Sequence, residues 1–526
     1  MKKTIAILLA LVLALSVMFV GCGNSSKGNE GKTLTFGVQM YADGLINIPN
    51  QTNCAWNCMR FGISESLFKF NDDMETVPWL AESYEYSEDH LTWTIKLRDG
   101  IKFSNGTDVT ATKVKESLDW IRAEGPNGST GPETFLEFEA EVTADDATNT
   151  IVIQTKTPYV NLAGNLADPA MAIIDVAGTT DFDNGIIGTG PYMVKDFTDQ
   201  VGYTMVKNPY YWDGEVPFDT VNILFMGDAS AKANALLAGQ IDIAENIMSV
   251  SDLATLQADK NFTVDITAGV RVGFSWMNMA EGRPLSNKTL RQAVLMAIPA
   301  DTICHSNVIG DLYSPGFSVL PSGMDYGYDQ LTNPYPYDPD AAMALLDDAG
   351  IVDTNGNGIR ELDGEDIYLT YVYYENRLLN DFSEAHAQYL SAIGIGTKME
   401  NGSSDDQWNK LVAGEYDLNN NNWNHLIAGA PVKYMANWYS PSENTDYCGY
   451  VNPEYDRLYA QLEVELDYDA RRELLRQLQQ ILIDDAAVLV DGYYNSCIVY
   501  NNSTVGYAHI RPMDYYWLST EIVPAS

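Results

Sequence analysis

The chain has 526 residues, a length that predicts two to four domains of about 100–200 residues each. Hydrophobic residues make up 46% and charged residues 20%, which excludes a disordered chain and a collagen-like fibre. Acidic residues outnumber basic residues 72 to 31, and the formal charge of −41 would repel phosphate backbones, so no nucleic-acid partner is expected.

The N-terminus has the layout of a secretory signal, predicted to span residues 1–21. Lys2 and Lys3 precede an apolar run, Ile5–Val20, that is shorter than the roughly 20 residues of a spanning helix. Residues 22–31 form a polar tether. The preceding Phe19-Val20-Gly21-Cys22 resembles a bacterial lipobox, which implies cleavage before Cys22 and a lipid on its sulfur. The alternative is a plain signal with an incidental cysteine.

Five further cysteines follow: Cys54, Cys58, Cys304, Cys448 and Cys497. Because five is odd, at least one is unpaired. Cys54 and Cys58 are four residues apart without a zinc-spaced cluster, so we interpret them as structural thiols or as one disulfide. The five scattered histidines argue against a catalytic transition-metal site.

Periodicity predicts the elements of the first half of the chain. Apolar and polar residues alternate along 91–97, which indicates a half-buried strand. Asp108 or Thr110 is expected to cap a helix with Val114, Leu118 and Ile121 on one face. The other predictions are a strand at 32–38, a helix at 60–70, a strand–turn–strand at 139–158, a hairpin at 192–212, and a helix closed by Gly239 before a short strand within 232–244.

After Arg271 the pattern favours mixed α/β structure. Asp338-Pro339 begins a helix that ends at Gly350, and Ser286 is expected to cap another helix over 286–298. The remaining predictions are a strand at 367–374, a helix entering a strand over 383–395, a leucine-striped helix at 470–486 and strands in 487–500. Strands with intervening helices indicate α/β lobes, and the absence of a repeat of about 20–50 residues in the sequence argues against a solenoid or propeller.

Several segments, taken in order, resemble bacterial extracytoplasmic solute-binding proteins of family 5, which serve peptide, nickel and related ABC importers. They are LTWTIKLRDGIKFSNGTDVTATKVKESL (91–118), GTGPYMVKDF (188–197), VKNPYYWDGEVPFDTV (206–221), ALLAGQIDIA (235–244), RPLSNKTLRQAVLMAIPADTI (283–303), YDPDAAMALLDDAG (337–350), VNPEYDRLYAQL (451–462) and RRELLRQLQQILIDDAAVLV (471–490). Each segment alone is weak, but together they cover nearly the whole mature chain in the right order.

The resemblance implies a two-lobed α/β periplasmic-binding-protein fold, hinge-linked by crossing strands, with an extra subdomain in the first lobe. The expected boundaries are lobe I at 32–65, 185–275 and 493–526, its inserted subdomain at 66–184, and lobe II at 276–492. Ligand would lie between the lobes, which close on it. Gly188 and Gly190 could supply hinge backbone, or could simply form a hairpin turn.

The resemblance also implies ligand-binding positions in the second lobe. In peptide-binding members an Asp shortly after a Trp holds the ligand ammonium; here Leu426 falls about at that place after Trp423, so recognition of that kind is in doubt. An uncompensated buried ammonium would cost several kcal/mol. Arg377, after the strand tyrosines Tyr373 and Tyr374, could clamp a ligand carboxylate or could be a solvated surface arginine.

In the first lobe, Asn53-Cys54-Ala55-Trp56 aligns with family residues that touch ligand backbone. Trp56, Trp423, Tyr373 and Tyr374 would form an aromatic pocket together with the amides of Asn419 to Asn422 and Asn424. Such a pocket suits a peptide or a stacked sugar, and each aromatic could equally pack in the core. His425 is the imidazole expected at the pocket if the solute is a nickel chelate. Replacing Trp423 by Ala should weaken binding at least tenfold, which corresponds to about 1.4 kcal/mol.

Residues 353–361 have the alternating oxygens of a calcium loop, with candidate ligands Asp353, Asn355, Asn357, Ile359 and Glu361. Gly358 stands sixth, as in such loops, but position twelve is Gly364, so Glu361, Asp363 or Glu365 would have to supply the last carboxylate. A structural Ca²⁺ is one interpretation, and a polar turn between helix and strand is the other.

We therefore expect a monomeric, non-enzymatic lipoprotein outside the cytoplasm, held at the membrane by its lipid and requiring no cofactor. It would capture a small solute, in first place an oligopeptide, and deliver it to ABC permease and ATPase subunits. An oligosaccharide or a nickel or other metal chelate is the alternative solute. A secreted hydrolase is disfavoured because the sequence has no GxSxG and no HExxH, and a surface adhesin is the third possibility.

Overall fold

The computed structural model describes residues 32–39, 48, 52–124, 140–426, 430–441 and 447–526. The signal peptide, the tether and the lipidation of Cys22 lie outside these ranges. The helices and strands below belong to one unit, Thr33–Ser526. None of its described helices combines the length and the apolarity that a membrane crossing requires.

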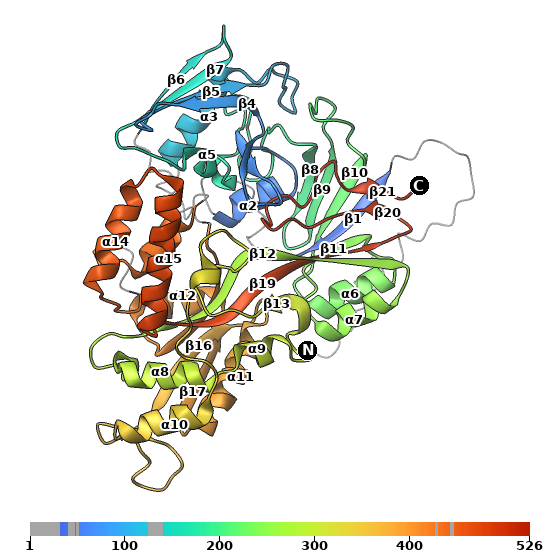
Figure 1. Ribbon diagram of the computed structural model, residues 1–526. Coiled ribbons are helices and arrows are strands. Elements are labelled where there is room, and N and C mark those ends of the chain that lie inside the picture. Colours follow the sequence, from blue (N-terminus) through green and yellow to red (C-terminus); the bar gives the residue numbers. More distant parts are fainter. Residues whose placement is uncertain (1–31, 40–47, 49–51, 125–139, 427–429, 442–446) are drawn as a thin grey trace, which may run out of the picture. The chain divides into compact units, whose positions relative to one another are not determined.

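An 11-stranded mixed β-sheet is the central element of the unit (Figure 1). Its order is β17-β16-β18-β12-β19-β11-β1-β10-β9-β8, with β13 paired to β19. The strands are β1 Thr33–Val38, β8 Tyr192–Thr198, β9 Gly202–Lys207, β10 Thr220–Phe225, β11 Ile243–Glu245, β12 Phe262–Met277, β13 Tyr313–Ser314, β16 Tyr368–Tyr374, β17 Gly396–Gly402, β18 Leu418–Asn424 and β19 Val488–Asn501. Because β12 and β19 are long, they link the strands of both expected lobes.

The register of these two strands shifts in their middle. Residues 262–268 of β12 pair with 495–501 of β19, whereas residues 271–277 pair with β18 and with the first half of β19. The shift falls between Ala268 and Arg271, where a β-carbon on Gly269 would stand 3.0 Å from the carbonyl oxygen of Tyr494. A bulge with a glycine is the usual way to bend such a strand.

A separate four-stranded antiparallel sheet, β4-β5-β7-β6, falls within the range 66–184 expected for the inserted subdomain. Its strands are β4 Ala81–Tyr86, β5 Thr92–Leu97, β6 Ala140–Asp145 and β7 Thr150–Thr155, with β2 Phe68–Phe70 and β3 Thr76–Pro78 paired beside it. Helix α3 (Ala111–Glu124) buries Val114, Leu118 and Ile121, as the periodicity predicted. The Thr110 hydroxyl accepts from the Lys113 amide and so caps the helix. Residues of the range 66–184 share one hydrophobic core with residues of the ranges expected for lobe I.

Most of the long helices that accompany the sheet come after residue 287 in the sequence. They are α8 Lys288–Ala297, α9 Ala300–Cys304, α10 Pro339–Asp348, α11 Leu379–Ala392, α12 Ser404–Ala413, α13 Pro431–Met435, α14 Pro453–Val464 and α15 Tyr468–Asp484, while α6 Ala229–Leu237 and α7 Val250–Ala258 belong to the first half. Asp338 caps α10 as predicted. Leu475, Leu478 and Leu482 of the predicted leucine stripe are buried on one face of α15.

Two local predictions were wrong. The helix expected at 60–70 lies instead at Thr52–Arg60 (α2), because Gly62 adopts φ +63° and the Ile63 amide donates back to the Cys58 carbonyl, which closes the helix. The cap of α8 is Asn287 rather than Ser286, since the Asn287 side chain accepts from the Leu290 amide at 3.1 Å.

The five cysteines after Cys22 are buried inside the unit. Cys58, Cys304 and Cys497 are free thiols, so the disulfide that the sequence left open between Cys54 and Cys58 does not form. Burial raises the pKa of the Cys58 thiol, with the neighbouring Cys54 as the second cause. A buried protonated thiol is a packing group and not a reactive one.

Candidate functional site

Helix α2 carries the four first-lobe candidates. Cys54 and Ala55 are fully buried, and the side chain of Asn53 lies outside the described part of the structure. Trp56 is half-buried, with its ring centroid 5.8 Å from that of Tyr515. The guanidinium carbons of Arg60 and Arg271 each lie 5.0 Å from the Trp56 ring centroid. Trp56 therefore contacts two cations as well as the core.

Asp514 is the acidic partner of this cluster, although it is 454 residues away from Arg60 in sequence. Arg60 Nη2 donates to Asp514 Oδ2 at 2.7 Å, and Arg60 Nε donates to the Asp514 carbonyl oxygen at 2.7 Å. Burial alone would raise the pKa of Asp514, but the positive charges around it outweigh burial and hold that pKa below its ordinary value. The carboxylate is therefore ionised and already engaged by Arg60.

Arg271 is the second arginine beside Asp514, and it is only 5% exposed. Its Nε lies 3.6 Å from Asp514 Oδ2, and neither Nε nor Nη2 makes a hydrogen bond with any residue the structure describes. Burial lowers the pKa of Arg271; Asp514 opposes that shift, while Arg377 and Arg60 add to it. A buried guanidinium with unused donors is rare in folded proteins.

Two further candidates from the sequence gather around Arg271. Asn424 stands opposite it in the β12–β18 register and donates to the Tyr515 hydroxyl at 3.0 Å. The guanidinium of Arg377 lies 5.9 Å from the ring centroid of Tyr494, the residue paired with Arg271 on β19. Trp56, Asn424 and Arg377 are thus brought together, and we call them with Arg271, Arg60, Asp514 and Tyr515 the arginine cluster.

The other aromatic candidates lie apart from the arginine cluster. Trp423 points to the opposite side of β18 and packs on Trp276 and Trp408, with ring centroids 5.6 and 6.1 Å away. Tyr373 is 7% exposed and packs against Tyr371. Tyr374 lines a separate polar cavity of about 370 Å³ between Gln39 and the start of α12. These three residues do not form one aromatic pocket with Trp56.

His425 and the asparagines before it are internal. His425 is fully buried, its Nδ1 contacts the Val270 carbonyl oxygen, and burial lowers its pKa to about 4, an effect that this contact partly offsets. The amides of Asn420 and Asn422 donate to the Ser383 and Tyr313 hydroxyls. The hydrogen bonds that these residues make are internal, whereas His425 Nε2, Asn420 Oδ1 and Asn422 Oδ1 are buried without a hydrogen bond to any described residue.

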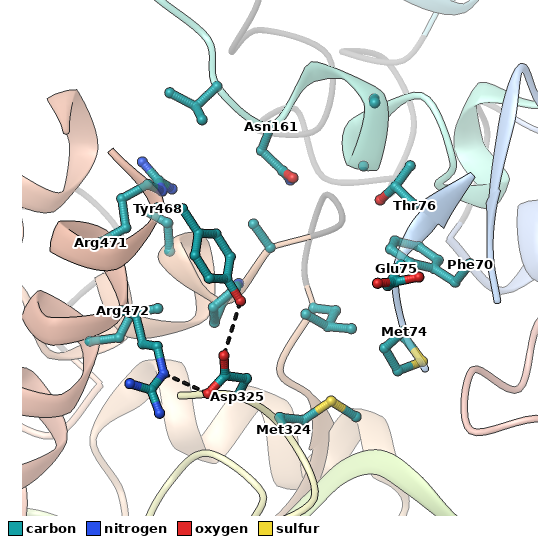
Figure 2. A pocket seen from close by; sticks show the side chains of 18 of the residues that line it. Phe70, Met74, Glu75, Thr76, Asn161, Met324, Asp325, Tyr468, Arg471 and Arg472 are labelled. Atoms are coloured by element: carbon teal, nitrogen blue, oxygen red, sulfur yellow. Dashed lines mark hydrogen bonds and ion pairs between the residues drawn. The ribbon is translucent and has the colours of Figure 1, made fainter. Parts of the chain in front are cut away.

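A cavity of about 620 Å³ lies between two walls that come from distant parts of the sequence (Figure 2). One wall comes from the range expected for the inserted subdomain and includes Phe70, Met74, Glu75, Thr76 and Asn161. The facing wall comes from the expected lobe II and includes Met324, Asp325, Tyr468, Arg471 and Arg472. Its volume is within the range of small-molecule sites, about 300–1,000 Å³.

Polar groups on the second wall are fixed by each other. Arg472 Nε donates to Asp325 Oδ1 at 2.5 Å, and the Tyr468 hydroxyl donates to Asp325 Oδ2 at 3.3 Å (Figure 2). Leu426 also lines the cavity, and its amide donates to Asn424 Oδ1 at 2.9 Å. Residues 424–426 therefore connect the cavity to the arginine cluster.

Residues 75–446 match the family described as bacterial extracellular solute-binding proteins, family 5 Middle. The chain belongs to this family. Family 5 is made of solute-binding transport proteins, and the two-lobed α/β fold that the sequence led us to expect is the fold of its members.

Three relatives illustrate the family. The glutathione-binding protein GsiB of Escherichia coli O1:K1 / APEC is 32% identical over 292 residues, which is 54% of this chain and about half (55%) of that protein. The probable D,D-dipeptide-binding periplasmic protein DdpA of Escherichia coli K12 is 26% identical over 82% of both chains. The fold matches NikA from Brucella suis, solved in complex with Fe(III)-EDTA, with a TM-score of 0.82, 23% identity and coverage of 94% and 99%.

The two glycines expected at the hinge of this family 5 chain have a steric role in the structure. A β-carbon on Gly188 would stand 2.2 Å from the Ile63 carbonyl oxygen, and one on Gly190 would stand 2.2 Å from that of Gly62. Both glycines therefore permit close packing within the first lobe. Their hinge role stays a prediction, and the register shift at Ala268/Arg271 lies on the strands that link the lobes.

The predicted calcium loop is a hydrogen-bonded turn. The Asp353 carboxylate accepts from the amides of Gly356 and Gly358, and that of Glu361 accepts from the amides of Thr354 and Asn355. The side chains of Asn355 and Asn357 donate to Asp366. Within the described residues no three His, Cys, Asp or Glu side chains form a group that could hold a metal. Calcium binding by Asp353, Asn355, Asn357, Ile359 and Glu361 stays a prediction.

Sequence reasoning missed Arg60, Arg271, Asp514 and Tyr515. Arg60 and Asp514 are 454 residues apart and Asn424 and Tyr515 are 91 residues apart, so the spacing of neighbouring residues does not reveal these hydrogen bonds. One signal was present: Arg271 interrupts the apolar run VRVGFSWM of a strand that is otherwise buried, where a charge has to be compensated.

Proposed function

We propose that this chain is the extracytoplasmic solute-binding component of an ABC importer, that it captures a peptide-like solute, and that it releases the solute chemically unaltered to permease and ATPase subunits. Membership of family 5 over residues 75–446 carries the proposal. The relatives named for glutathione and for D,D-dipeptides support a peptide-like solute. The cavity of about 620 Å³ supports a guest of small-peptide size.

The proposal includes the anchor. Cys22 would carry the lipid and hold the protein at the outer face of the cell membrane through residues 22–31. Acylation with two or more chains is enough for stable membrane attachment. Replacing Cys22 by Ala should move the protein from the membrane fraction to the culture fluid, and an unchanged distribution would contradict the anchor alone.

Native mass spectrometry of the purified full-length chain tests the solute. We expect an added mass of a few hundred daltons that fragments as a peptide after release. A released sugar or metal chelate would replace the peptide by one of the alternative solutes and leave the transport role standing. Peptide fragments produced on incubation with the pure protein would indicate a hydrolase and would overturn the proposal.

A further inference from the structure

We propose that Arg271 binds a carboxylate of the solute, with Trp56 and Arg377 beside it, so that this site selects carboxylate-bearing solutes over neutral or purely cationic ones. This inference rests on the proposed function, because it names the group by which the solute is recognised. It assigns a ligand contact to a residue inside the strand that joins the two lobes.

The first support is the unused hydrogen-bonding capacity of Arg271. Nε and Nη2 are buried and have no acceptor among the described residues. A buried neutral donor without an acceptor costs about 1–3 kcal/mol of stability, and a charged donor costs more. Asp514 is the nearest acidic group: Arg60 holds its Oδ2 at 2.7 Å, Arg271 Nε forms a longer ion pair of 3.6 Å with the same oxygen, and Asp514 Oδ1 accepts no hydrogen bond from the described residues. A carboxylate from outside the chain would satisfy two parallel donors at once.

The second support is the charge around Asp514. The positive charges of Arg60, Arg271 and Arg377 all act on this one carboxylate. Guanidinium groups held in a medium of low dielectric attract an anion strongly, and their planar fork matches a carboxylate better than an ammonium group would. The guanidinium carbon of Arg271 lies 5.0 Å from the ring centroid of Trp56, and this ring is only half-buried, so the cluster includes a side chain that solvent reaches.

The third support is Leu426, whose amide donates to Asn424 Oδ1 of the arginine cluster at 2.9 Å. Leu426 lines the cavity with an apolar side chain that is 4% exposed. Leu426 has no charge that could compensate a cationic group of the solute. Arg271 has a positive charge that could compensate an anionic group. The charge preference of the site is directed at the acidic group of the guest.

A carboxylate can come from a peptide C-terminus or from an acid that chelates a metal, and the test separates these sources. Calorimetry is done with tri-alanine and tri-alanine amide, glutathione and its C-terminal amide, nickel citrate, and maltotriose as a neutral sugar. We expect an acid to bind at least about 30-fold more tightly than its amide, which is about 2 kcal/mol. Binding of nickel citrate with no peptide acid would keep Arg271 and change the source.

The variants are Arg271→Met and Arg271→Lys. The control is Arg291→Lys, because Arg291 is buried to a similar degree and its hydrogen bonds go to backbone carbonyl groups outside the arginine cluster. We expect the acid-over-amide preference to fall below about threefold in Arg271→Met, to be intermediate in Arg271→Lys, and to be unchanged in Arg291→Lys. Thermal unfolding without solute verifies that each variant folds, and Arg271→Lys carries the test if Arg271→Met does not fold.

Two outcomes overturn the inference and are distinguishable. If peptides bind with no preference for the acid, or if Arg271→Met keeps the preference, the assignment of Arg271 falls while the transport role stands. If maltotriose alone binds, or if no member of the panel binds, the peptide-like solute of the proposed function falls with it.

Discussion

Arg291 in α8 and Arg271 in β12 are buried to the same degree, at 6% and 5% exposure, but their surroundings differ. Arg291 donates to the backbone carbonyl oxygens of Leu285, Ser286, Asp485 and Ala486. For Arg271, two of the three guanidinium nitrogens have no acceptor in the described part of the chain. The difference teaches that burial alone does not distinguish a structural arginine from a ligand-binding one. The number of guanidinium N–H donors that lack an acceptor within the protein does distinguish them.

Stability measurements give the largest expected contrast. Arg291→Met should lower the free energy of unfolding by about 3–5 kcal/mol, because several buried carbonyl groups lose their donor. Arg271→Met should change it by less than about 1 kcal/mol, since few protein hydrogen bonds are lost. Urea denaturation followed by circular dichroism measures both, and equal losses would break the comparison.

The pH dependence of stability extends the comparison to His386, a buried basic residue that we do not place in the binding site. Burial lowers the pKa of His386 to about 3 from 6.5, so between these values the unfolded chain binds more protons than the folded one. Stability should therefore fall as the pH falls below about 6, by about 1.4 kcal/mol per pH unit from this residue. Glu65, whose pKa burial raises to about 7, acts in the opposite sense between about pH 4.5 and 7.

The histidine contribution is isolated by comparing wild type with His386→Gln at each pH. Denaturation midpoints between pH 6.5 and 4.5 should separate less as the pH falls, because the variant lacks the group that takes up the proton on unfolding. Parallel curves would mean that His386 titrates alike in both states.

The two tryptophans extend the comparison from cations to aromatics. Trp423→Ala should lower the free energy of unfolding by about 2–3 kcal/mol because its ring packs on Phe274, Trp276 and Trp408. Trp56→Ala should instead weaken solute binding about tenfold, or about 1.4 kcal/mol. Calorimetry and denaturation on both variants also test the tenfold loss that the sequence predicts for Trp423→Ala.

Reversing the charge preference at the cavity wall is a smaller test. Leu426→Asp should bind tri-alanine about tenfold more tightly than N-acetyl-tri-alanine, whereas wild type should distinguish them by less than about threefold. Leu426→Asn is the matched control, because it has similar size and no charge. An acetyl-sensitive wild type would mean that another residue holds the ammonium.

The smallest effect is expected at the loop of residues 353–361. Calcium at 1 mM should raise the unfolding temperature by about 1 °C relative to a chelator, since the loop carboxylates already accept hydrogen bonds from backbone amides. Asp353→Asn should abolish that increment. A rise of many degrees would show that the loop reorganises around the metal.

Local physics in the sequence predicted much of the fold. Alternation marked the strand at Thr92–Leu97, and Asp338-Pro339 marked the start of α10, because these signals depend on neighbours in the chain. The helix expected at 60–70 was displaced because Gly62, packed against the Leu518 carbonyl oxygen, ends α2 through a contact with the far end of the chain.

The candidate site was predictable only in part, for the same reason. Trp56, Asn424 and Arg377 were found through the family resemblance, whereas Asp514 becomes visible only when the fold brings it 2.7 Å from Arg60. Trp423 and Tyr373 carry the same side-chain chemistry as Trp56 but face the core of the second half. Residue type therefore nominated aromatics, and three-dimensional packing separated them.

Arg271 stands at the first position after the register shift on the strand shared by both lobes. If the lobes rotate about that shift, the same small change of backbone that parts them would also swing the guanidinium away from Trp56 and Asp514. Opening of the lobes and release of the solute carboxylate would then be one conformational change. A permease that separates the lobes would release the solute by the same movement.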